Sequence, residues 1–80
     1  MMVKLKIGAG FRYYVPHVGD LIQGVELDVP AGSTLGQLLD LTGFPEEIST
    51  IPLVNGDRAG KNRILEENDQ VYLLQPAMGG

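Results

Sequence analysis

The sequence predicts a two-layer α+β domain, in which one main helix covers one face of a mixed sheet of four to five strands. Two early segments, residues 3–7 and 25–29, alternate apolar with charged residues, and this period of two is typical of half-buried strands. Residues 35–42 place leucines at helical spacing. Apolar runs at 51–54 and 71–74 add strands after the helix. The helix therefore crosses over between two parts of one sheet and packs on one of its faces.

The first two predicted strands carry opposite charges on their exposed faces. Lys4 and Lys6 separate the apolar residues of the first strand, and Glu26 and Asp28 separate those of the second. If the two strands pair antiparallel, lysines lie across from carboxylates, and such pairs contribute ~0.2–1 kcal/mol each. Both strands therefore agree on which face of the sheet points outward.

The helix has start and stop signals that predict its bounds as residues 35–42. Thr34 and Gln37 fit a capping box, in which each side chain accepts a hydrogen bond from the backbone of the other residue. Gly43 follows the last turn, where glycine is preferred, and Pro45 prevents the helix from continuing. Residues 45–48 are expected to add one more helical turn.

The second half of the chain predicts a third strand, a hairpin turn and a short return strand. Residues 51–54 form the third strand, and Pro52 indicates an edge or a strand start. Asn55-Gly56 is a strong signal for a tight hairpin turn, and residues 57–61 are expected to form a brief return strand. Ile64 and Leu65 are then predicted to pack inward.

Residues 71–74 form the last predicted strand, whose successive side chains point to opposite faces. Val71 and Leu73 share the face toward the helix, so Tyr72 and Leu74 face away from it and are candidate interface residues, unless flanking loops cover them. The complete order is strand, strand, helix, strand, short strand, strand. This is the order of a β-grasp, or ubiquitin-like, fold, in which the last strand lies centrally and parallel to the first.

We expect a β-grasp domain over residues 1–75 and a flexible C-terminal tail over residues 76–80. The sequence ends in Gly79-Gly80, which places a carboxylate on a segment without side chains. Glycine also takes backbone angles that are closed to other residues. We therefore expect the tail to project clear of the body, where it can thread a narrow channel in a partner.

The stretch from residue 8 to residue 23 is long for a hairpin connection. It holds three of the five aromatic residues, Phe11, Tyr13 and Tyr14. Two interpretations are open: these rings cap the open end of the core, or they form an aromatic patch that faces a partner near the tail.

The composition excludes several functional classes. Eighty residues make one domain. The absence of cysteine removes disulfides, thiolate catalysis and cysteine metal sites. The single histidine, His17, cannot form a metal site by itself, so no metal is predicted. The net charge of −4, without a basic patch, argues against nucleic acid as a partner and is compatible with a basic protein partner.

The sequence also predicts no membrane partner and no catalytic centre. No apolar run approaches the ~20 residues that cross a bilayer, and the first residues lack the apolar region of a signal peptide. We therefore expect a cytoplasmic protein. The sequence indicates no Ser/His/Asp set, phosphate-binding loop or paired-carboxylate site.

A set of short motifs in the last 27 residues carries a family resemblance. These motifs are Val54-Asn55-Gly56, then Leu65, then Asn68-Asp69-Gln70-Val71, then Pro76-Ala77-Met78-Gly79-Gly80. They resemble the C-terminal half of the MoaD/ThiS family of ubiquitin-like sulfur-carrier proteins, which includes the small subunit of molybdopterin synthase and the sulfur carrier of thiamine biosynthesis. Asn68 stands where that family usually has glycine, and asparagine tolerates the left-handed conformation that such a turn needs.

The resemblance implies a carrier rather than an enzyme. An E1-like enzyme would adenylate the Gly80 carboxylate with ATP, and a sulfur donor would convert the acyl adenylate into a thiocarboxylate. The sulfur would then be used in an acceptor enzyme, which is the large subunit of molybdopterin synthase or thiazole synthase. Pro76 and the tail pattern favour molybdopterin, thiamine is the next choice, and other sulfur acceptors remain open. The carrier itself binds no cofactor, because ATP is used by the activating partner.

The same resemblance implies roles for the residues around Gly80. Gly79 would thread the channel of the activating enzyme. Pro76, Ala77 and Met78 would contact partners along the tail, together with Tyr72 and Leu74 on the last strand.

Two alternatives of other classes share the predicted fold. The first is a ubiquitin-like modifier, whose activated Gly80 is joined to a lysine of another protein. The second is a plain β-grasp interaction domain, in which the terminal glycines are incidental. The early chemistry of carrier and modifier is shared, so the sequence does not separate them.

Overall fold

The computed structural model describes residues 1–13, 19–44 and 49–76. Within these ranges it contains five strands, two α-helices and one 3-10 helix. In chain order these are β1 (Met2–Ile7), η1 (Ala9–Tyr13), α1 (Gly19–Gln23), β2 (Val25–Asp28), α2 (Leu35–Thr42), β3 (Ile51–Val54), β4 (Asp57–Arg58) and β5 (Gln70–Leu74).

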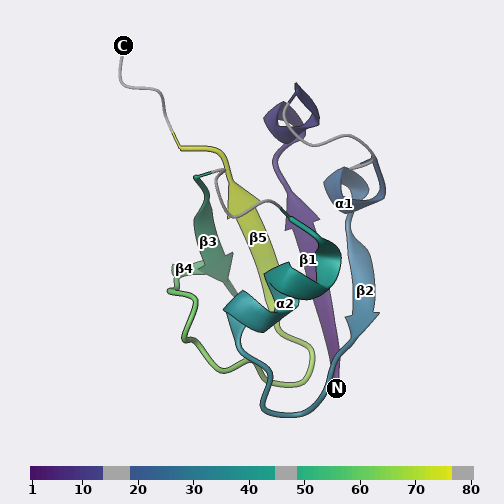
Figure 1. Ribbon diagram of the computed structural model, residues 1–80, viewed down its shortest axis with the longest axis vertical. Coiled ribbons are helices and arrows are strands. Elements are labelled where there is room, and N and C mark those ends of the chain that lie inside the picture. Colours follow the sequence, from purple (N-terminus) through teal and green to yellow (C-terminus); the bar gives the residue numbers. More distant parts are fainter. Residues whose placement is uncertain (14–18, 45–48, 77–80) are drawn as a thin grey trace.

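The strands form one mixed sheet in the order β2-β1-β5-β3-β4 (Figure 1). β1 and β5 are parallel, with Leu5 beside Val71 and Ile7 beside Leu73. The other neighbouring pairs are antiparallel. The last strand therefore lies centrally, beside and parallel to the first, and the predicted β-grasp architecture is confirmed.

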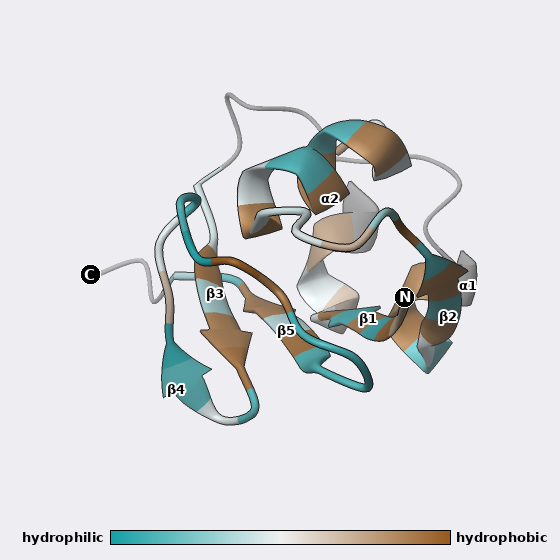
Figure 2. Ribbon diagram, turned by 90° about the horizontal axis from the view of Figure 1, so that it is seen from below, coloured by the Kyte–Doolittle hydropathy of each residue, from teal (hydrophilic) through white to brown (hydrophobic). Residues whose placement is uncertain are grey.

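α2 covers one face of the sheet, and the other face carries no described element (Figure 2). The predicted bounds of this helix are confirmed, and so is its capping box. The Thr34 N–H donates to Gln37 Oε1 at 2.8 Å, and the Gln37 N–H donates to Thr34 Oγ1 at 3.2 Å. Gly43 closes the helix in the left-handed region, at φ 73°, where glycine has no steric cost.

The core lies between α2 and the sheet. Its fully buried side chains come from the alternating positions that the sequence predicted on β1, α2 and β5. They are joined by Phe11 of η1, Val54 of β3 and Leu65 of the loop before β5. The described buried apolar residues form one cluster: Val3, Leu5, Ile7, Phe11, Val29, Leu35, Leu38, Leu39, Phe44, Val54, Leu65, Val71 and Leu73.

The long connection after β1 is not a simple loop, because it contains η1 and α1. The Phe11 side chain is fully buried, and its ring meets that of Phe44 edge to face, with centroids 5.3 Å apart. Capping of the core is thus confirmed for Phe11. The side chain of Tyr13, Tyr14 as a whole and His17 lie outside the described residues.

The turn after β3 has the predicted form. Asn55 and Gly56 both have positive φ, 53° and 89°, as a two-residue hairpin turn of the favoured hand requires. The return strand is shorter than predicted, because β4 spans only Asp57–Arg58. Asn68 also has positive φ, 69°, so its predicted tolerance of the left-handed region is used here.

Two further expectations are corrected or refined by the structure. Ile64 was predicted to pack inward, yet it is 61% exposed while Leu65 is buried. Ile64 forms an isolated bridge with Thr34, so the chain is extended here, and consecutive side chains point to opposite sides. Pro52 lies at the second position of β3, and its carbonyl accepts from the Ala59 N–H at 3.0 Å. The backbone nitrogen of Pro52, which carries no hydrogen, therefore points toward β4. The hydrogen bonds between β3 and β5 do not need a donor at this position.

The predicted helical turn at 45–48 falls outside the described residues. None of the described helices is long and apolar enough to span a membrane.

Candidate functional site

The tail begins at the end of the central strand β5. The N–H of Gly8 donates to the Leu73 carbonyl at 2.9 Å, which continues the parallel contact between β1 and β5 by one residue. Gln75 is exposed and Pro76 is half-buried, and residues 77–80 lie outside the described residues. The roles of Gly79 and Gly80, and of Ala77 and Met78, therefore stay predictions.

The side chains of Tyr72 and Leu74 lie on the uncovered face of the sheet, as predicted. Strand register places Leu53 opposite Tyr72 and Ile51 opposite Leu74, and all four residues are half-buried. They make a partly exposed apolar strip beside the start of the tail. We call this strip, with the cations that border it, the open sheet face; its residues are Lys4, Lys6, Ile51, Leu53, Arg58, Tyr72 and Leu74.

The open sheet face is bordered by cations on two sides. Lys6 is exposed, and its Nζ lies over the ring of Tyr72, 5.7 Å from the centroid, within the range of a cation–π contact. Arg58 is exposed on β4 opposite Leu53, and Lys4 precedes Lys6 on the same face. Three of the six Lys and Arg residues of the chain thus lie here.

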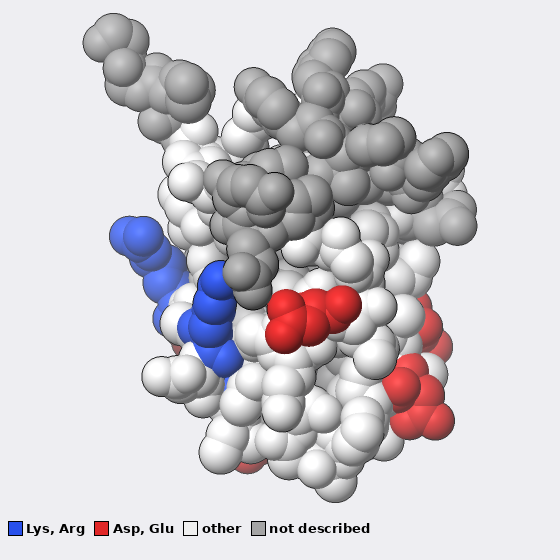
Figure 3. Space-filling model, viewed as in Figure 1, with Lys and Arg blue, Asp and Glu red and all other residues white. Residues whose placement is uncertain are grey.

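Carboxylates lie beside these lysines, on the edge strand that is farther from the apolar strip. Glu26 and Asp28 are on the edge strand β2, opposite Lys4 and Met2, and the N-terminal amine contacts Asp28 Oδ1 at 3.1 Å. On the face that carries α2, red carboxylate atoms lie over α2 and along β2, whereas blue atoms lie on the side of β3 and β4 (Figure 3). The net charge of the chain is compatible with a basic partner, whereas the charged side chains that directly border the apolar strip are cations, with Glu26 opposite Lys4 one strand farther out.

Two motif residues of the family resemblance have a structural role. Asp69 is only 6% exposed and accepts from Asn55 Nδ2 and from the Glu66 N–H, both at 2.8 Å. Asn55 Oδ1 accepts from the Gln70 N–H at 2.9 Å. These bonds tie the hairpin turn after β3 to the entry of β5. They stabilise the strand that leads to the tail.

The side chain of Gln75 lies against Gly10 of η1, and sequence reasoning missed this contact. A Cβ added at Gly10 would overlap Gln75 Oε1, so a larger residue there would require the amide to move. The available signal was Gly10 itself, because a glycine soon after a strand often marks a close approach of another group.

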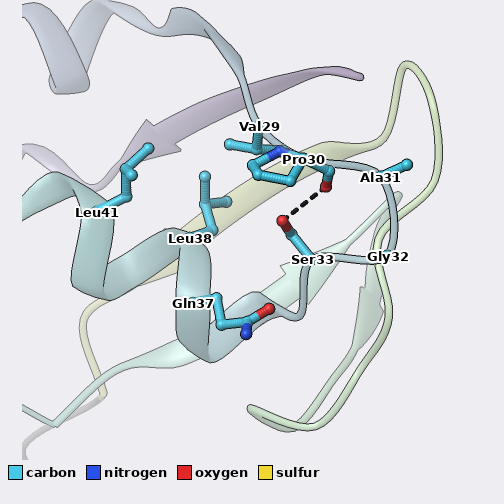
Figure 4. Close-up of a pocket in the computed structure, with 8 residues that line it drawn as sticks. All are labelled: Val29, Pro30, Ala31, Gly32, Ser33, Gln37, Leu38 and Leu41. Carbon is cyan, nitrogen blue, oxygen red and sulfur yellow. Dashed lines mark hydrogen bonds between the residues drawn. The ribbon is translucent and has the colours of Figure 1, made fainter.

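A cleft of about 390 Å³ lies on the helix side, between α2 and the loop after β2 (Figure 4). Val29, Leu38 and Leu41 contribute apolar surface, and the hydroxyl of Ser33 already donates to the Pro30 carbonyl at 2.7 Å. None of the described residues that line it is charged. The cleft follows β2, whose end pairs with the start of β1, so it lies at the opposite end of the sheet from the tail. Among the described residues, no group of three His, Cys, Asp or Glu could hold a metal ion.

Known proteins resemble the chain in structure. No protein-family model matches it, and no curated protein matches it. SAMP1 from Haloferax volcanii superposes with a TM-score of 0.76 at 23% identity, over 100% of both chains. A Pyrococcus furiosus protein described as molybdopterin converting factor, subunit 1, gives a TM-score of 0.76 at 23% identity, over 96% of this chain and 99% of that one.

A further solved structure is a complex of subunits 1 and 2 of the molybdopterin-converting factor from Helicobacter pylori. It contains a chain that matches with a TM-score of 0.63 at 18% identity, over 100% of both chains. At these identities the likeness establishes the fold, and it covers the whole chain. The chain therefore has the ubiquitin-like β-grasp fold that its sequence predicted.

Proposed function

We propose that the chain is a sulfur carrier whose Gly80 carboxylate is the reacting group. A carboxylate is a poor electrophile until its oxygen becomes part of a leaving group. Attack of the carboxylate on the α-phosphate of ATP, in an E1-like partner, releases pyrophosphate and forms an acyl adenylate. Hydrosulfide supplied by the sulfur donor then attacks the acyl carbon and displaces AMP, and loss of its proton leaves a thiocarboxylate on Gly80. The chain is a co-substrate in this scheme, and the enzymes are its partners.

The observation that carries the proposal is the position of β5. It is the central strand of the sheet, and it leads directly into Gln75, Pro76 and the last four residues of the sequence. A segment that follows a central strand starts from a rigid base. Glycines at 79 and 80 present little bulk to a narrow channel. The shared fold with SAMP1 and with two subunits named for molybdopterin conversion adds support.

The open sheet face is the proposed docking surface for these partners. Its apolar strip, with Tyr72 and Leu74, adjoins the tail, and Lys6 and Arg58 border it. A complementary partner presents an apolar centre bordered by carboxylates, because buried apolar area supplies affinity and opposite charge speeds association. Pro76, Ala77 and Met78 then extend the contact toward the channel.

The acceptor we favour is the large subunit of a molybdopterin synthase, with thiazole synthase next. Two similar solved structures carry the molybdopterin name, and one of them is a complex of a small subunit with its partner. Growth of a host strain that lacks its molybdopterin carrier, or its thiamine carrier, separates the two acceptors when this chain is supplied. We also propose that the protein acts in the cytoplasm, because the adenylation uses ATP.

The proposal is tested by the mass of Gly80. The chain is co-expressed with the E1-like enzyme of its own host, the intact mass is measured, and the C-terminal peptide is fragmented. Sulfur in place of oxygen adds nearly the same mass as oxidation of a methionine, and Met78 is in the same peptide. Fragmentation must therefore place the shift on Gly80. The chain without Gly80 is the control.

A sulfur-bearing Gly80 is the expected result. An unmodified Gly80 beside an active partner, or a mature protein whose last residue is not Gly80, would contradict the carrier. A plain interaction domain would then be favoured if deletion of Gly80 leaves partner binding unchanged.

A protein modifier is the second candidate function. It is favoured by the likeness to small archaeal modifier protein 1 of Haloferax volcanii, which has a TM-score of 0.73. The discriminating product is an isopeptide that joins Gly80 to a lysine of another protein. Peptide mapping of host proteins after expression of a tagged chain detects this bond, whereas the carrier produces the thiocarboxylate alone.

A further inference from the structure

The short helix η1 beside the tail is anchored in the core of the domain. The Phe11 side chain is 0% exposed, and its ring packs edge to face on Phe44, at an interplanar angle of 88°. The Phe11 N–H donates to the Gly8 carbonyl at 3.1 Å. η1 therefore holds its place relative to the sheet.

The start of the tail is fixed to the same part of the domain. The Gly8 N–H donates to the Leu73 carbonyl at 2.9 Å, and a Cβ added at Gly8 would lie 3.9 Å from the Gln75 N. Gly10, two residues further, faces the side chain of Gln75. A Cβ there would overlap Gln75 Oε1 and lie 3.1 Å from Gln75 Cδ.

This contact acts on the residue from which the tail departs. Gln75 precedes Pro76, whose ring fixes φ and whose Cδ keeps the preceding residue extended. With few backbone angles left free at this point, a contact that holds Gln75 also restricts the direction of the chain after it. Gln75 is exposed, and exposed side chains away from special features contribute little to stability.

We propose that the contact of Gln75 with Gly10 is a clasp that sets the direction in which residues 76–80 leave the domain. The functional part of this inference rests on the proposed carrier function. Gln75 and Gly10 are positioning residues: they hold the tail so that, when the open sheet face is docked, Gly80 reaches the nucleotide in the activating enzyme.

Three variants and a matched control test the clasp. Gln75→Ala removes the amide, Gly10→Ala displaces it, and a double variant carries both changes. Gly60→Ala is the control, because a Cβ at Gly60 has no neighbour within 4 Å. In the isolated full chain we expect a nuclear Overhauser effect between Gly10 Hα and the Gln75 side-chain amide. It should disappear in Gly10→Ala, which keeps the amide, and persist in the control, with the same urea midpoint in all variants.

The direction of the tail is measured without any partner. The chain has no cysteine, so Met78→Cys accepts a single nitroxide label. In the parent chain we expect the label to enhance relaxation of amides on one side of the domain. In Gln75→Ala and Gly10→Ala the affected set should change. An unchanged set, or no Overhauser effect in the parent chain, would overturn the clasp.

The consequence for activation is measured by ATP–pyrophosphate exchange with the adenylating enzyme of the same host. We expect kcat to fall about ten-fold in each single variant, because a displacement of about 1 Å can cost up to ~100-fold in rate. KM should stay unchanged, because the open sheet face is intact. The kcat of the double variant should be no lower than that of the single variants, because all three variants lose the same contact.

The outcomes separate the clasp from the carrier function. The clasp is contradicted if exchange in the single variants stays within about two-fold of the parent. It is also contradicted if the loss in the double variant equals the product of the two single losses. Neither result contradicts the carrier. Absence of exchange in the parent chain itself contradicts the carrier, and the label experiment then decides the clasp alone.

Discussion

At the scale of single residues, Asn55 joins two parts of the fold that are distant in sequence. It adopts positive φ in the hairpin turn, donates to the buried Asp69, and accepts from the Gln70 N–H. A glycine here would keep the backbone angle and lose both side-chain bonds. An alanine would lose the bonds and also strain the backbone. The two substitutions therefore separate hydrogen bonding from conformation.

We expect Asn55→Gly to lower the free energy of unfolding by about 1–3 kcal/mol, because Asp69 and the Gln70 N–H each lose a partner. Asn55→Ala should cost a further ~1–2 kcal/mol for its left-handed backbone. Urea unfolding of both variants measures the two steps. Wild-type stability of Asn55→Gly would show that the network contributes nothing.

Ile64 and Leu65 are neighbours with opposite exposure, 61% and 2%. Leu65→Ala should cost about 2–5 kcal/mol, because it leaves a cavity in the core. Ile64→Ala should stay within about 0.5 kcal/mol of the parent chain. Thermal and urea unfolding compare the two, and equal losses would contradict the extended geometry at this bridge.

At the scale of elements, α2 contains a glycine that lowers its helix propensity and lets the 60–63 loop pack close to it. Gly36 lies in its first turn, where glycine costs ~1 kcal/mol relative to alanine. Its N–H donates to the Lys61 carbonyl at 2.9 Å, and an added Cβ would lie 3.3 Å from that oxygen and from Lys61 Cβ. The packing of the loop on the helix thus accounts for a residue that local preference disfavours.

The side chains of β5 alternate between two environments. Val71 and Leu73 are buried in the core, and Tyr72 and Leu74 are half-buried on the open sheet face. The strand therefore carries stability on one side and the proposed interface on the other, so changes on the two sides should have separable effects.

We expect Leu74→Glu to weaken binding to the adenylating enzyme by about ten-fold or more, because interface residues that matter cost above ~1 kcal/mol. Its free energy of unfolding should change by less than about 1 kcal/mol. Titration calorimetry measures the binding. Leu41→Glu, at an exposed leucine of α2, is the matched control. An unfolded Leu74→Glu, or equal loss in Leu41→Glu, would contradict the proposed surface.

At the scale of the whole molecule, the charge is unevenly distributed. The chain carries −4 in sum, yet Lys4, Lys6 and Arg58 border the strip beside the tail. Such an arrangement steers association with a partner of opposite local charge, independently of the net charge of the protein.

We expect Lys6→Glu with Arg58→Glu to lower the association rate constant with the adenylating enzyme by about ten-fold at low salt. The dependence of that rate on salt should also become weaker. Stopped-flow kinetics across a salt series gives both quantities. Lys61→Glu with Arg63→Glu makes the same change of charge away from the open sheet face. A similar loss in that control would attribute the effect to net charge alone.

Much of the fold follows from local pattern. The capping box of Thr34 and Gln37, the alternation of β1 and β5, and the turn at Asn55-Gly56 each depend on residues within a few positions of one another. The exposure of Ile64 and the short length of β4 could not be predicted in this way, because each depends on the segment with which these residues pair. The helices after β1 were also missed, since residues 8–23 lack a clear period.

The sequence by itself determined the β-grasp order, the bounds of the main helix, and Tyr72 and Leu74 as outward residues. Hydrophobic period and cap chemistry specify all three, and both act locally. Only the tertiary structure decided which cations border the apolar strip, that Asn55 satisfies Asp69, and that Gln75 lies on Gly10. Apart from Arg58 beside Leu53, each of these joins residues that are 14 or more positions apart in the chain. Such pairs come into contact only after the sheet has been assembled.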